Sequence, residues 1–401
     1  MSITQIQIGQ TRLLFGRDSV KGAAEEVKRL GGRRPLVVTD AALVKLGLLE
    51  KLEESLRQGE LDWACYDRVM PDPASASVDE AVRLLREEGC DCVIGIGGGS
   101  VMDTAKCTAA MAANGGSLLD YDHANTDYRE FEKGSLPLIS IPTTAGTGSE
   151  LSPYAVITNE QAGRKATIGS PMLYADAALV DPSLTLGLPK GATAATGSDA
   201  LAHCIEAYTS VKSAAKPNLI IDGLVLQGLN CLCKALPGAC EDGSNYELRE
   251  QVMWGSTIGG FVLQYGSGAA HGLANVLGGE LHVPHGNAIG MLLPHVVEFN
   301  RDVCRKRYAR LAAGLGLLGD SEEALAKTFA EYIREMFRKL SLPFLASWLK
   351  ETDRISELAE LALKDKCTRQ NCRPLTWEDA CCLYKKAYHG NYHLQNGNTS
   401  E

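Results

Sequence analysis

The chain has 401 residues and a formal net charge of −9, with 45% hydrophobic and 22% charged residues. This length exceeds the roughly 250–300 residues at which a single hydrophobic core stops growing, so we expect two domains in a soluble globular protein. No apolar run approaches the ~18 residues of a membrane-spanning helix. The acidic balance, without a basic cluster, argues against a nucleic-acid partner.

The chain is expected to be cytoplasmic. Its first residues, MSITQIQIGQTRLLFG, lack the basic segment and apolar core of a signal peptide. The thirteen cysteines are scattered, and three pairs that lie close in the sequence lack the CxxC spacing of a zinc site: Cys231 and Cys233, Cys367 and Cys372, Cys381 and Cys382. We therefore expect reduced thiols with no role in metal binding.

Residues 1–188 alternate short β-branched runs with helical patterns. The runs 34–40, 61–69, 91–97 and 136–142 are predicted strands. The segments between them have apolar residues at the i, i+3, i+4 spacing of amphipathic helices. Strands that alternate with helices predict parallel βαβ units, and hence a doubly wound α/β domain.

Residues 189–401 lose the strand signal, and helical patterns such as LIIDGLVLQGLNCLCKAL dominate. We expect an all-helical second domain that is packed against the first, with a cleft between them. The polar tail, residues 393–401, is expected to fray.

Two loops after predicted strands are candidates for binding phosphate. Residues 94–106 (IGIGGGSVMDTAK) contain a strand, then Gly97, Gly98, Gly99 and Ser100, and then a helix. This arrangement directs backbone N–H groups and a helix N-terminus at an anion. Residues 142–150 (PTTAGTGSE) place four hydroxyl side chains beside two glycines: Thr143, Thr144, Thr147 and Ser149. Each loop has an alternative role as a tight structural turn, but two such loops at strand ends favour a nucleotide site.

Asp40 ends the first predicted strand, a place where dinucleotide-binding folds often put an acid against the adenosine ribose. A carboxylate there accepts from the 2′-hydroxyl and repels a 2′-phosphate, which predicts NAD over NADP. Capping the next helix is an equally good interpretation of Asp40, and both roles are compatible.

The segment GSDALAHCIEAY places Asp199 and His203 one helical turn apart, so that both side chains lie on one helix face. Residues 266–286 add His271, His282 and His285. Imidazoles with one carboxylate suit a divalent metal such as Fe²⁺ or Zn²⁺, and Asp199, His203, His271 and His285 are the predicted ligands. The alternative is that these histidines are hydrogen-bonded residues of the core.

Several long motifs in this order resemble the iron-dependent (group III) alcohol dehydrogenase family. They are GGGSVMDTAK, IPTTAGTGSE, VDPSLTLGLP, TGSDALAHCIEAY, AAHGLANVLGGELHVPHGNAIGMLLPHV and RPLTWEDACCLYKKAY. The resemblance implies a Rossmann-like NAD(P)-binding domain, an all-helical metal-binding domain and a metal held by the four residues named above. For the cofactor it implies contacts from Asp40, Gly98, Gly99, Ser100, Asp103, Thr143, Thr144, Thr147, Ser149 and Lys165. It also implies a homodimer or larger oligomer, with the first two strands at the subunit contact.

Three positions depart from the family pattern on the substrate side. Asn275 stands where many members have a histidine four residues after the third ligand, and Gln264 stands where asparagine is frequent. The usual Asn-Pro-Arg is here Asn371, Cys372 and Arg373. These residues predict a polar pocket for a small polar or anionic-substituted aldehyde, of the sulfoacetaldehyde or lactaldehyde type, although a general alcohol dehydrogenase stays possible.

The predicted reaction is the metal-assisted interconversion of such an aldehyde and its primary alcohol with NAD(H), in which the metal acts as a Lewis acid. His282 and Asn275 are the only candidates for a further catalytic role. Two alternatives stay open. One is an enzyme similar to dehydroquinate synthase or glycerol dehydrogenase, and the other is a non-catalytic protein that binds NAD and metal.

Overall fold

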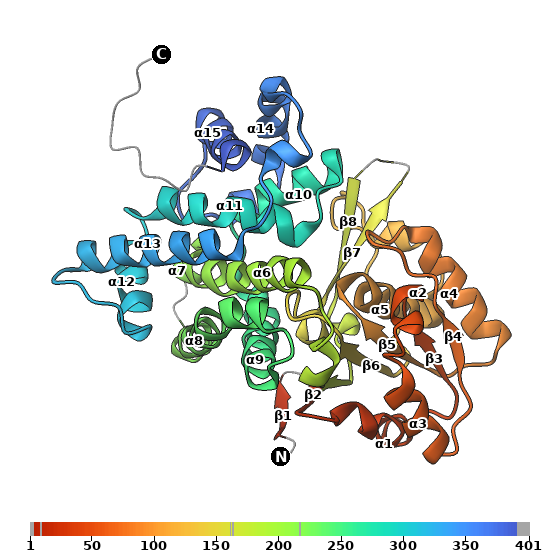
Figure 1. The fold of residues 1–401 in the computed structure, drawn as a ribbon. Helices are drawn as coiled ribbons and strands as arrows, with labels where there is room; N and C mark the ends of the chain where they lie inside the picture. Colours follow the sequence, from red (N-terminus) through yellow and green to blue (C-terminus); the bar gives the residue numbers. More distant parts are fainter. Residues whose placement is uncertain (1–3, 9, 161, 163, 216–217, 391–401) are drawn as a thin grey trace. The chain divides into compact units, whose positions relative to one another are not determined.

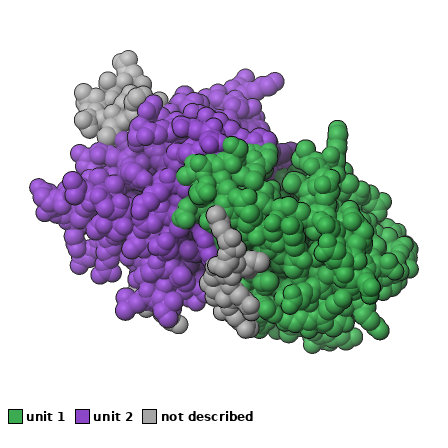
Figure 2. Space-filling model, turned by 60° about the horizontal axis from the view of Figure 1, so that its bottom comes forward, with its two compact units in different colours: residues 1–188, 243–253 green, residues 189–242, 254–401 purple. Residues whose placement is uncertain are grey.

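The computed structural model describes residues 4–8, 10–160, 162, 164–215 and 218–390. The chain separates into two compact units (Figure 2): residues 1–188 with 243–253, and residues 189–242 with 254–401. Residues 243–253, which the sequence assigned to the helical domain, therefore belong to the first unit. The buried Arg249 accounts for this, because its guanidinium donates to the carbonyls of Leu188 (2.8 Å) and Gly243 (2.9 Å).

The first unit contains a seven-stranded sheet in the order β1-β2-β9-β6-β5-β3-β4, parallel except for the β1–β2 pair. Its strands are β1 (Thr4–Ile8), β2 (Thr11–Phe15), β3 (Pro35–Val38), β4 (Ala64–Tyr66), β5 (Cys92–Gly97), β6 (Leu138–Pro142) and β9 (Ala177–Val180). All four runs predicted as strands contain a strand, namely β3, β4, β5 and β6.

Helices cover both faces of this sheet (Figure 1). Because side chains alternate along a strand, Val37 packs with α1 (Ala23–Arg29) and α3 (Glu50–Gln58), on the face opposite to Leu36. Leu36 packs with α4 (Ser75–Glu87) and α5 (Gly99–Asn114). The predicted doubly wound α/β architecture is therefore confirmed, and the short helix α2 (Ala41–Lys45) follows β3.

An antiparallel hairpin, β7 (Tyr154–Asn159) and β8 (Arg164–Gly169), forms a second sheet that the sequence analysis did not predict. Its inward side chains, Ala155, Ile157, Ala166 and Ile168, pack with Cys107 and Met111 of α5. The central helix α5 is thus buried between the parallel sheet and the hairpin.

The second unit is helical, as predicted. Its helices are α6 (Lys190–Thr209), α7 (Val211–Ala215), α8 (Leu219–Glu241), most of α9 (Tyr246–Val262), α10 (Ala269–Leu281), α11 (His285–Asn300), α12 (Arg305–Gly314), α13 (Glu322–Leu340), α14 (Ile355–Lys364) and α15 (Trp377–His389). Helix α6 contacts α8, α10 and α11, and almost all of its second half is buried. The core of this unit therefore surrounds the segment that carries Asp199 and His203.

Helix α8 is long and apolar enough to cross a membrane, by length and composition alone. The expectation that no run approaches this length is therefore wrong for α8. Half of its apolar window is buried inside the protein, and it packs against α6, α12 and α13. Helix α8 is therefore packed into the core of the helical unit.

Candidate metal centre and nucleotide loops

The structure brings the four predicted ligands together from three helices. Asp199 Oδ1, on α6, lies 3.4 Å from Nε2 of His271 on α10 and 3.4 Å from Nε2 of His285 on α11. It lies 3.6 Å from Nε2 of His203, one turn further along α6. The ligand atoms of Asp199, His271 and His285 all lie within 4.8 Å of one another, an arrangement that can hold a metal ion.

Close packing of the first turn of α11 on α6 sets the position of His285. A Cβ atom on the next residue, Gly286, would lie 2.4 Å from the carbonyl oxygen of Ala195. Only glycine permits this approach. His285 itself is the first residue of α11, directly after Pro284, and it is the most exposed of the ligands, at 42% of its side chain.

Two buried ligand atoms, Asp199 Oδ1 and His271 Nε2, make no hydrogen bond to any residue that the structure describes. Leaving such a group unsatisfied costs about 1–3 kcal/mol, and a bound cation would satisfy both atoms. Burial alone would raise the pKa of Asp199, but His203 and His285 hold it well below its usual value. Burial lowers the pKa of His203 to about 4, so this side chain is the neutral imidazole that metals bind.

Glu206, one turn after His203 on α6, is a buried carboxylate that the sequence analysis missed. It accepts from the backbone N–H of Ala270 (2.6 Å) and lies 2.6 Å from Nδ1 of His271. A carboxylate only accepts, so Nδ1 of His271 donates and Nε2 is left facing Asp199. The spacing of Asp199, His203 and Glu206 at i, i+4 and i+7 was the signal in the sequence.

The charge around His271 favours a cation. Burial opposes a charge on this ring, yet Glu206 and Asp199 raise the pKa of His271 to about 10. The two carboxylates that attract a proton to this position attract a metal ion for the same reason. The donor set and its electrostatics therefore fit a divalent metal.

In the first unit, the glycine loop (residues 97–100) and the threonine loop (residues 142–150) are neighbours. They follow the adjacent parallel strands β5 and β6, and the backbone N–H of Thr143 donates to the carbonyl of Gly97 (2.9 Å). Gly98 precedes α5, and a Cβ atom on Gly99 would lie 2.7 Å from Cγ2 of Thr147. Both loops therefore lie at the carboxyl ends of the strands, where open α/β sheets bind ligands.

Hydrogen bonds of two charged side chains of α5, Lys106 and Asp103, hold the threonine loop; Lys106 is fully buried and was not singled out from the sequence. Its Nζ donates to Ser149 Oγ (2.7 Å) and to the carbonyls of Ser152 (2.9 Å) and Tyr154 (2.8 Å). Asp103, one turn before it, accepts from Ser149 Oγ (2.9 Å) and from the backbone N–H of Val156 (2.8 Å). Asp103 and Ser149 thus act within the protein to fix the loop.

Asp40 caps α2, since its Oδ1 accepts from the backbone N–H groups of Ala42 (2.9 Å) and Leu43 (3.0 Å). The capping role is confirmed, and the contact with ribose stays a prediction. Lys165, on β8, forms an ion pair with Asp72 and donates to Thr158 Oγ1 (3.2 Å).

The predicted substrate residues lie in three different settings. Asn275, one turn after His271, donates to Asp365 Oδ2 (3.2 Å) and lies beside the Cys367 thiol. Gln264 lies in the short helix η6 (Leu263–Tyr265) and donates to the carbonyl of Phe261 (2.9 Å).

Arg373 is engaged within the protein. Its guanidinium donates to the carbonyl of Phe299 (3.0 Å), stacks 3.9 Å from the ring of that residue and lies 4.0 Å from Asp379. His282 is exposed and terminates α10 in the left-handed conformation. Its backbone N–H donates to the carbonyl of Leu277. A role in terminating the helix explains His282.

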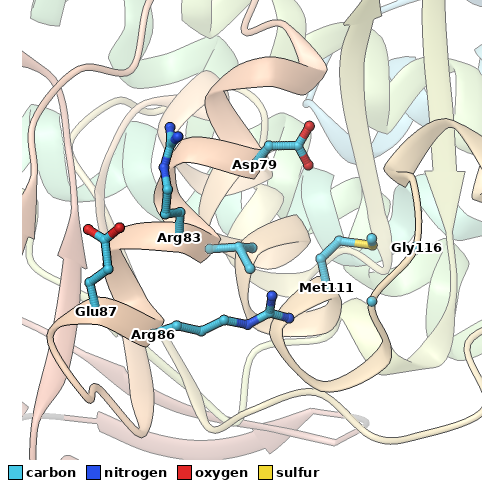
Figure 3. A pocket seen from close by; sticks show the side chains of 8 residues that line it. Asp79, Arg83, Arg86, Glu87, Met111 and Gly116 are labelled. Atoms are coloured by element: carbon cyan, nitrogen blue, oxygen red, sulfur yellow. The ribbon is translucent and has the colours of Figure 1, made fainter.

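A surface cavity of about 270 Å³ lies in the first unit, lined by Arg83, Arg86 and Glu87 of α4 and by Met111 and Gly116 at the end of α5 (Figure 3). Helix α5 begins at the glycine loop and has 16 residues, so its far end lies roughly 23 Å away from that loop. This cavity is therefore separate from the nucleotide loops.

Comparison with known proteins identifies the family. Residues 10–182 match the family model for iron-containing alcohol dehydrogenase, and residues 193–388 match the C-terminal model of the same family. The chain is 35% identical to the NAD-dependent methanol dehydrogenase of Bacillus methanolicus over 93% of this chain and 97% of that protein. It is 33% identical to the lactaldehyde reductase of Escherichia coli over 93% of this chain and 97% of that protein.

Comparison with solved structures supports the same family. A 1,3-propanediol oxidoreductase superposes with a TM-score of 0.89 at 29% identity, over 96% of this chain and 99% of that one. The sulfoacetaldehyde reductase of Bifidobacterium kashiwanohense in complex with NAD⁺ superposes with a TM-score of 0.85 at 26% identity, over 96% and 99%. The family and fold predicted from the motifs are confirmed: the chain belongs to the iron-containing alcohol dehydrogenase family and is an oxidoreductase.

Proposed function

We propose that the protein interconverts a small, polar-substituted aldehyde and its primary alcohol, with NAD(H) as the hydride carrier and iron as the metal. The observation that carries this proposal is the convergence of three ligand atoms, two of them buried and without a hydrogen bond. Bound iron supplies a Lewis acid, and the nicotinamide supplies or accepts a hydride.

The residues of the helical unit hold and orient the metal. Asp199, His203, His271 and His285 are the proposed ligands, with Zn²⁺ as the alternative ion, and the geometry around Asp199 Oδ1 supports this set. Glu206 accepts from Nδ1 of His271, so the neutral form of this ring has its proton on Nδ1 and its lone pair on Nε2, the atom that would bind the metal. An ordered carboxylate behind a histidine ligand is the usual arrangement in metal sites.

The first unit is the proposed NAD(H) site. Gly98 precedes α5 and Gly99 and Ser100 are its first two residues, and this helix N-terminus suits the pyrophosphate. The hydroxyls of Thr143, Thr144 and Thr147 line the adjacent loop, and Asp103, Ser149 and Lys165 are proposed to support it from behind. Asp40 is proposed to accept from the adenosine ribose and to disfavour NADP.

We propose a neutral, hydroxyl-bearing substituent as the substrate class. Asn275, the residue one turn beyond His271, presents an amide beside the Asp365 carboxylate, which suits a hydroxyl donor and repels an anion. Arg373, the cation that favoured an anionic substituent, is already paired with Phe299 and Asp379. These contacts support our proposal that lactaldehyde-type substrates are preferred over sulfoacetaldehyde-type ones.

The test is a panel of NADH-oxidation rates with lactaldehyde, sulfoacetaldehyde, phosphonoacetaldehyde, succinic semialdehyde, acetaldehyde and butyraldehyde. The proposal expects the highest kcat/KM for lactaldehyde. Clearly faster turnover of the unfunctionalised alkanals would refute a polar pocket. Binding of NAD and metal without turnover of any aldehyde would favour a non-catalytic protein, and transient NADH formation without net consumption would favour chemistry similar to dehydroquinate synthase.

We propose that the protein works as a cytoplasmic homodimer. All thirteen cysteines are free thiols, as expected in a reducing compartment. Strand β1 is the last strand at its end of the sheet and pairs only with β2 in the described structure, so that its outer edge offers backbone groups to a second copy. Light scattering coupled to size exclusion tests the dimer, and a monomer at micromolar concentration would contradict it.

A further inference from the structure

We propose that Cys304 and Cys372 form a dithiol site that oxidises reversibly to a disulfide. Cys304 is the residue directly before α12, and Cys372 lies between the short helix η9 (Thr368–Gln370) and α15. The two thiols, 68 residues apart in the sequence, are in direct contact, with their Sγ atoms 2.7 Å apart. Only a small movement is needed to reach the bonding distance of a disulfide.

The two thiols differ in the way that such a reaction requires. Cys304 is buried, with 3% of its surface exposed, whereas Cys372 is only half-buried. Cys304 donates its thiol hydrogen to Cys372, and this hydrogen bond lowers the pKa of Cys372. Cys372 is therefore the thiol that reacts first, and Cys304 is the thiol that resolves it.

The oxidant class that fits is a hydroperoxide. The Cys372 thiol loses its proton, the thiolate attacks one peroxide oxygen to form a sulfenic acid as the O–O bond breaks, and the leaving hydroxide takes up the released proton to give water. The Cys304 sulfur then attacks the sulfenic sulfur, so that the disulfide forms and a second water leaves. In total the two thiols lose two electrons, and one molecule of hydrogen peroxide is reduced to two molecules of water. A dithiol such as dithiothreitol reduces the disulfide back to the two thiols.

The segment that carries Cys372 also holds the start of the helix that bears His271. Asn371 Oδ1 accepts from the backbone N–H of Ala269 (3.3 Å), at the first turn of α10, and from Asn300 Nδ2 (2.9 Å). Gln370 Oε1 accepts from the backbone N–H of Ser267 (3.2 Å). A disulfide would tie this segment to the start of α12, and we infer that it stabilises the helical unit around the metal ligands.

The experiment treats the purified full-length protein with hydrogen peroxide or with dithiothreitol, blocks free thiols with N-ethylmaleimide and maps peptides by mass spectrometry without reduction. Trypsin does not cleave between Arg373 and Pro374, so fragment spectra must distinguish Cys372 from Cys381 and Cys382 on one peptide. We expect a Cys304–Cys372 link in the oxidised sample only. Thermal unfolding should show a Tm higher by roughly 5 °C, since the link closes a long loop.

Variants separate this link from general oxidation. Cys304→Ser and Cys372→Ser should lose both the cross-linked peptide and the reversible Tm shift, whereas Cys382→Ser, at an exposed thiol, should keep both. A wild-type protein in which peroxide forms no Cys304–Cys372 link would overturn the proposal, and this readout needs no variant to fold. A Tm shift of the same size in Cys304→Ser would overturn it as well.

Discussion

Replacement of Glu206 by glutamine tests how the metal centre is oriented. In the structure, Oε1 of Glu206 accepts from the N–H of Ala270 and Oε2 accepts from Nδ1 of His271, both at 2.6 Å. Glutamine has the same shape but only one acceptor oxygen. In Glu206→Gln, one of the two donors therefore meets an NH₂ group. If that donor is His271, its ring must turn over or change tautomer, and Nε2 then carries a proton where the metal should bind.

The size of the effect follows from the role of such carboxylates. Loss of a buried partner behind a histidine ligand lowers metal affinity by roughly 10–100-fold, which is about 1.4–2.7 kcal/mol at 25 °C. The fold should survive, because the substitution is isosteric. The exposed Glu280, near the other end of α10 and ion-paired with Arg354 (3.0 Å), provides a matched control in Glu280→Gln.

The assay is competition for Fe²⁺ or Co²⁺ against a chromophoric chelator under anaerobic conditions, with circular dichroism to confirm folding. Glu206→Gln should bind the metal at least tenfold more weakly than the wild type, and Glu280→Gln should bind it equally well. The Co²⁺ absorption bands should also shift, because the ligand field at His271 changes. Metal affinity within twofold of the wild type would refute the reasoning.

Three further predictions concern other residues. Asp40→Ser keeps a helix cap but removes the charge, so the ratio of kcat/KM for NADPH to that for NADH should rise by about tenfold or more; an unchanged ratio would rule out the ribose contact. Lys106→Met removes the Nζ donor to the carbonyls of Ser152 and Tyr154, so chemical denaturation should show a loss of about 3 kcal/mol in unfolding free energy, and the KM for NADH should rise. Burial, with Lys386 and Arg334, lowers the pKa of His295 to about 4. The unfolded state therefore binds a proton at His295 more readily than the folded state does. The unfolding free energy of the wild type should fall by up to roughly 3 kcal/mol from pH 6.5 towards pH 4, and that of His295→Gln should fall by less; parallel pH profiles of the two proteins would contradict this.

The parts of the fold that the sequence predicted are those with a strong local signal. The buried strands β3, β5 and β6 are apolar runs bounded by turn residues, and the helices have long amphipathic or apolar patterns. The hairpin β7–β8 was missed because its residues are partly polar and follow a loop that already had a functional interpretation. Strand β9, Ala177–Val180, is a short apolar run with two alanines, and periodicity alone does not distinguish such a run from a helix segment.

The ligand set was predictable because Asp199 and His203 lie one turn apart on one helix, and because His271 and His285 belong to a recognisable motif. The support for these ligands was harder to predict, since it depends on contacts between elements. Glu206 meets His271 across 65 residues, and Lys106 reaches Tyr154 across 48. The engagement of Arg373 by Phe299 and Asp379 depends on tertiary packing in the same way.

The central claim is that turnover requires a metal at Asp199, His203, His271 and His285, and metal removal with reconstitution tests it most directly. The protein is chelated under anaerobic conditions until metal analysis shows an empty site, and NADH oxidation with lactaldehyde is then measured before and after addition of one equivalent of Fe²⁺. We predict that activity falls to background and returns with Fe²⁺, and that Asp199→Ala does not respond. Full activity in the metal-free protein would contradict the account.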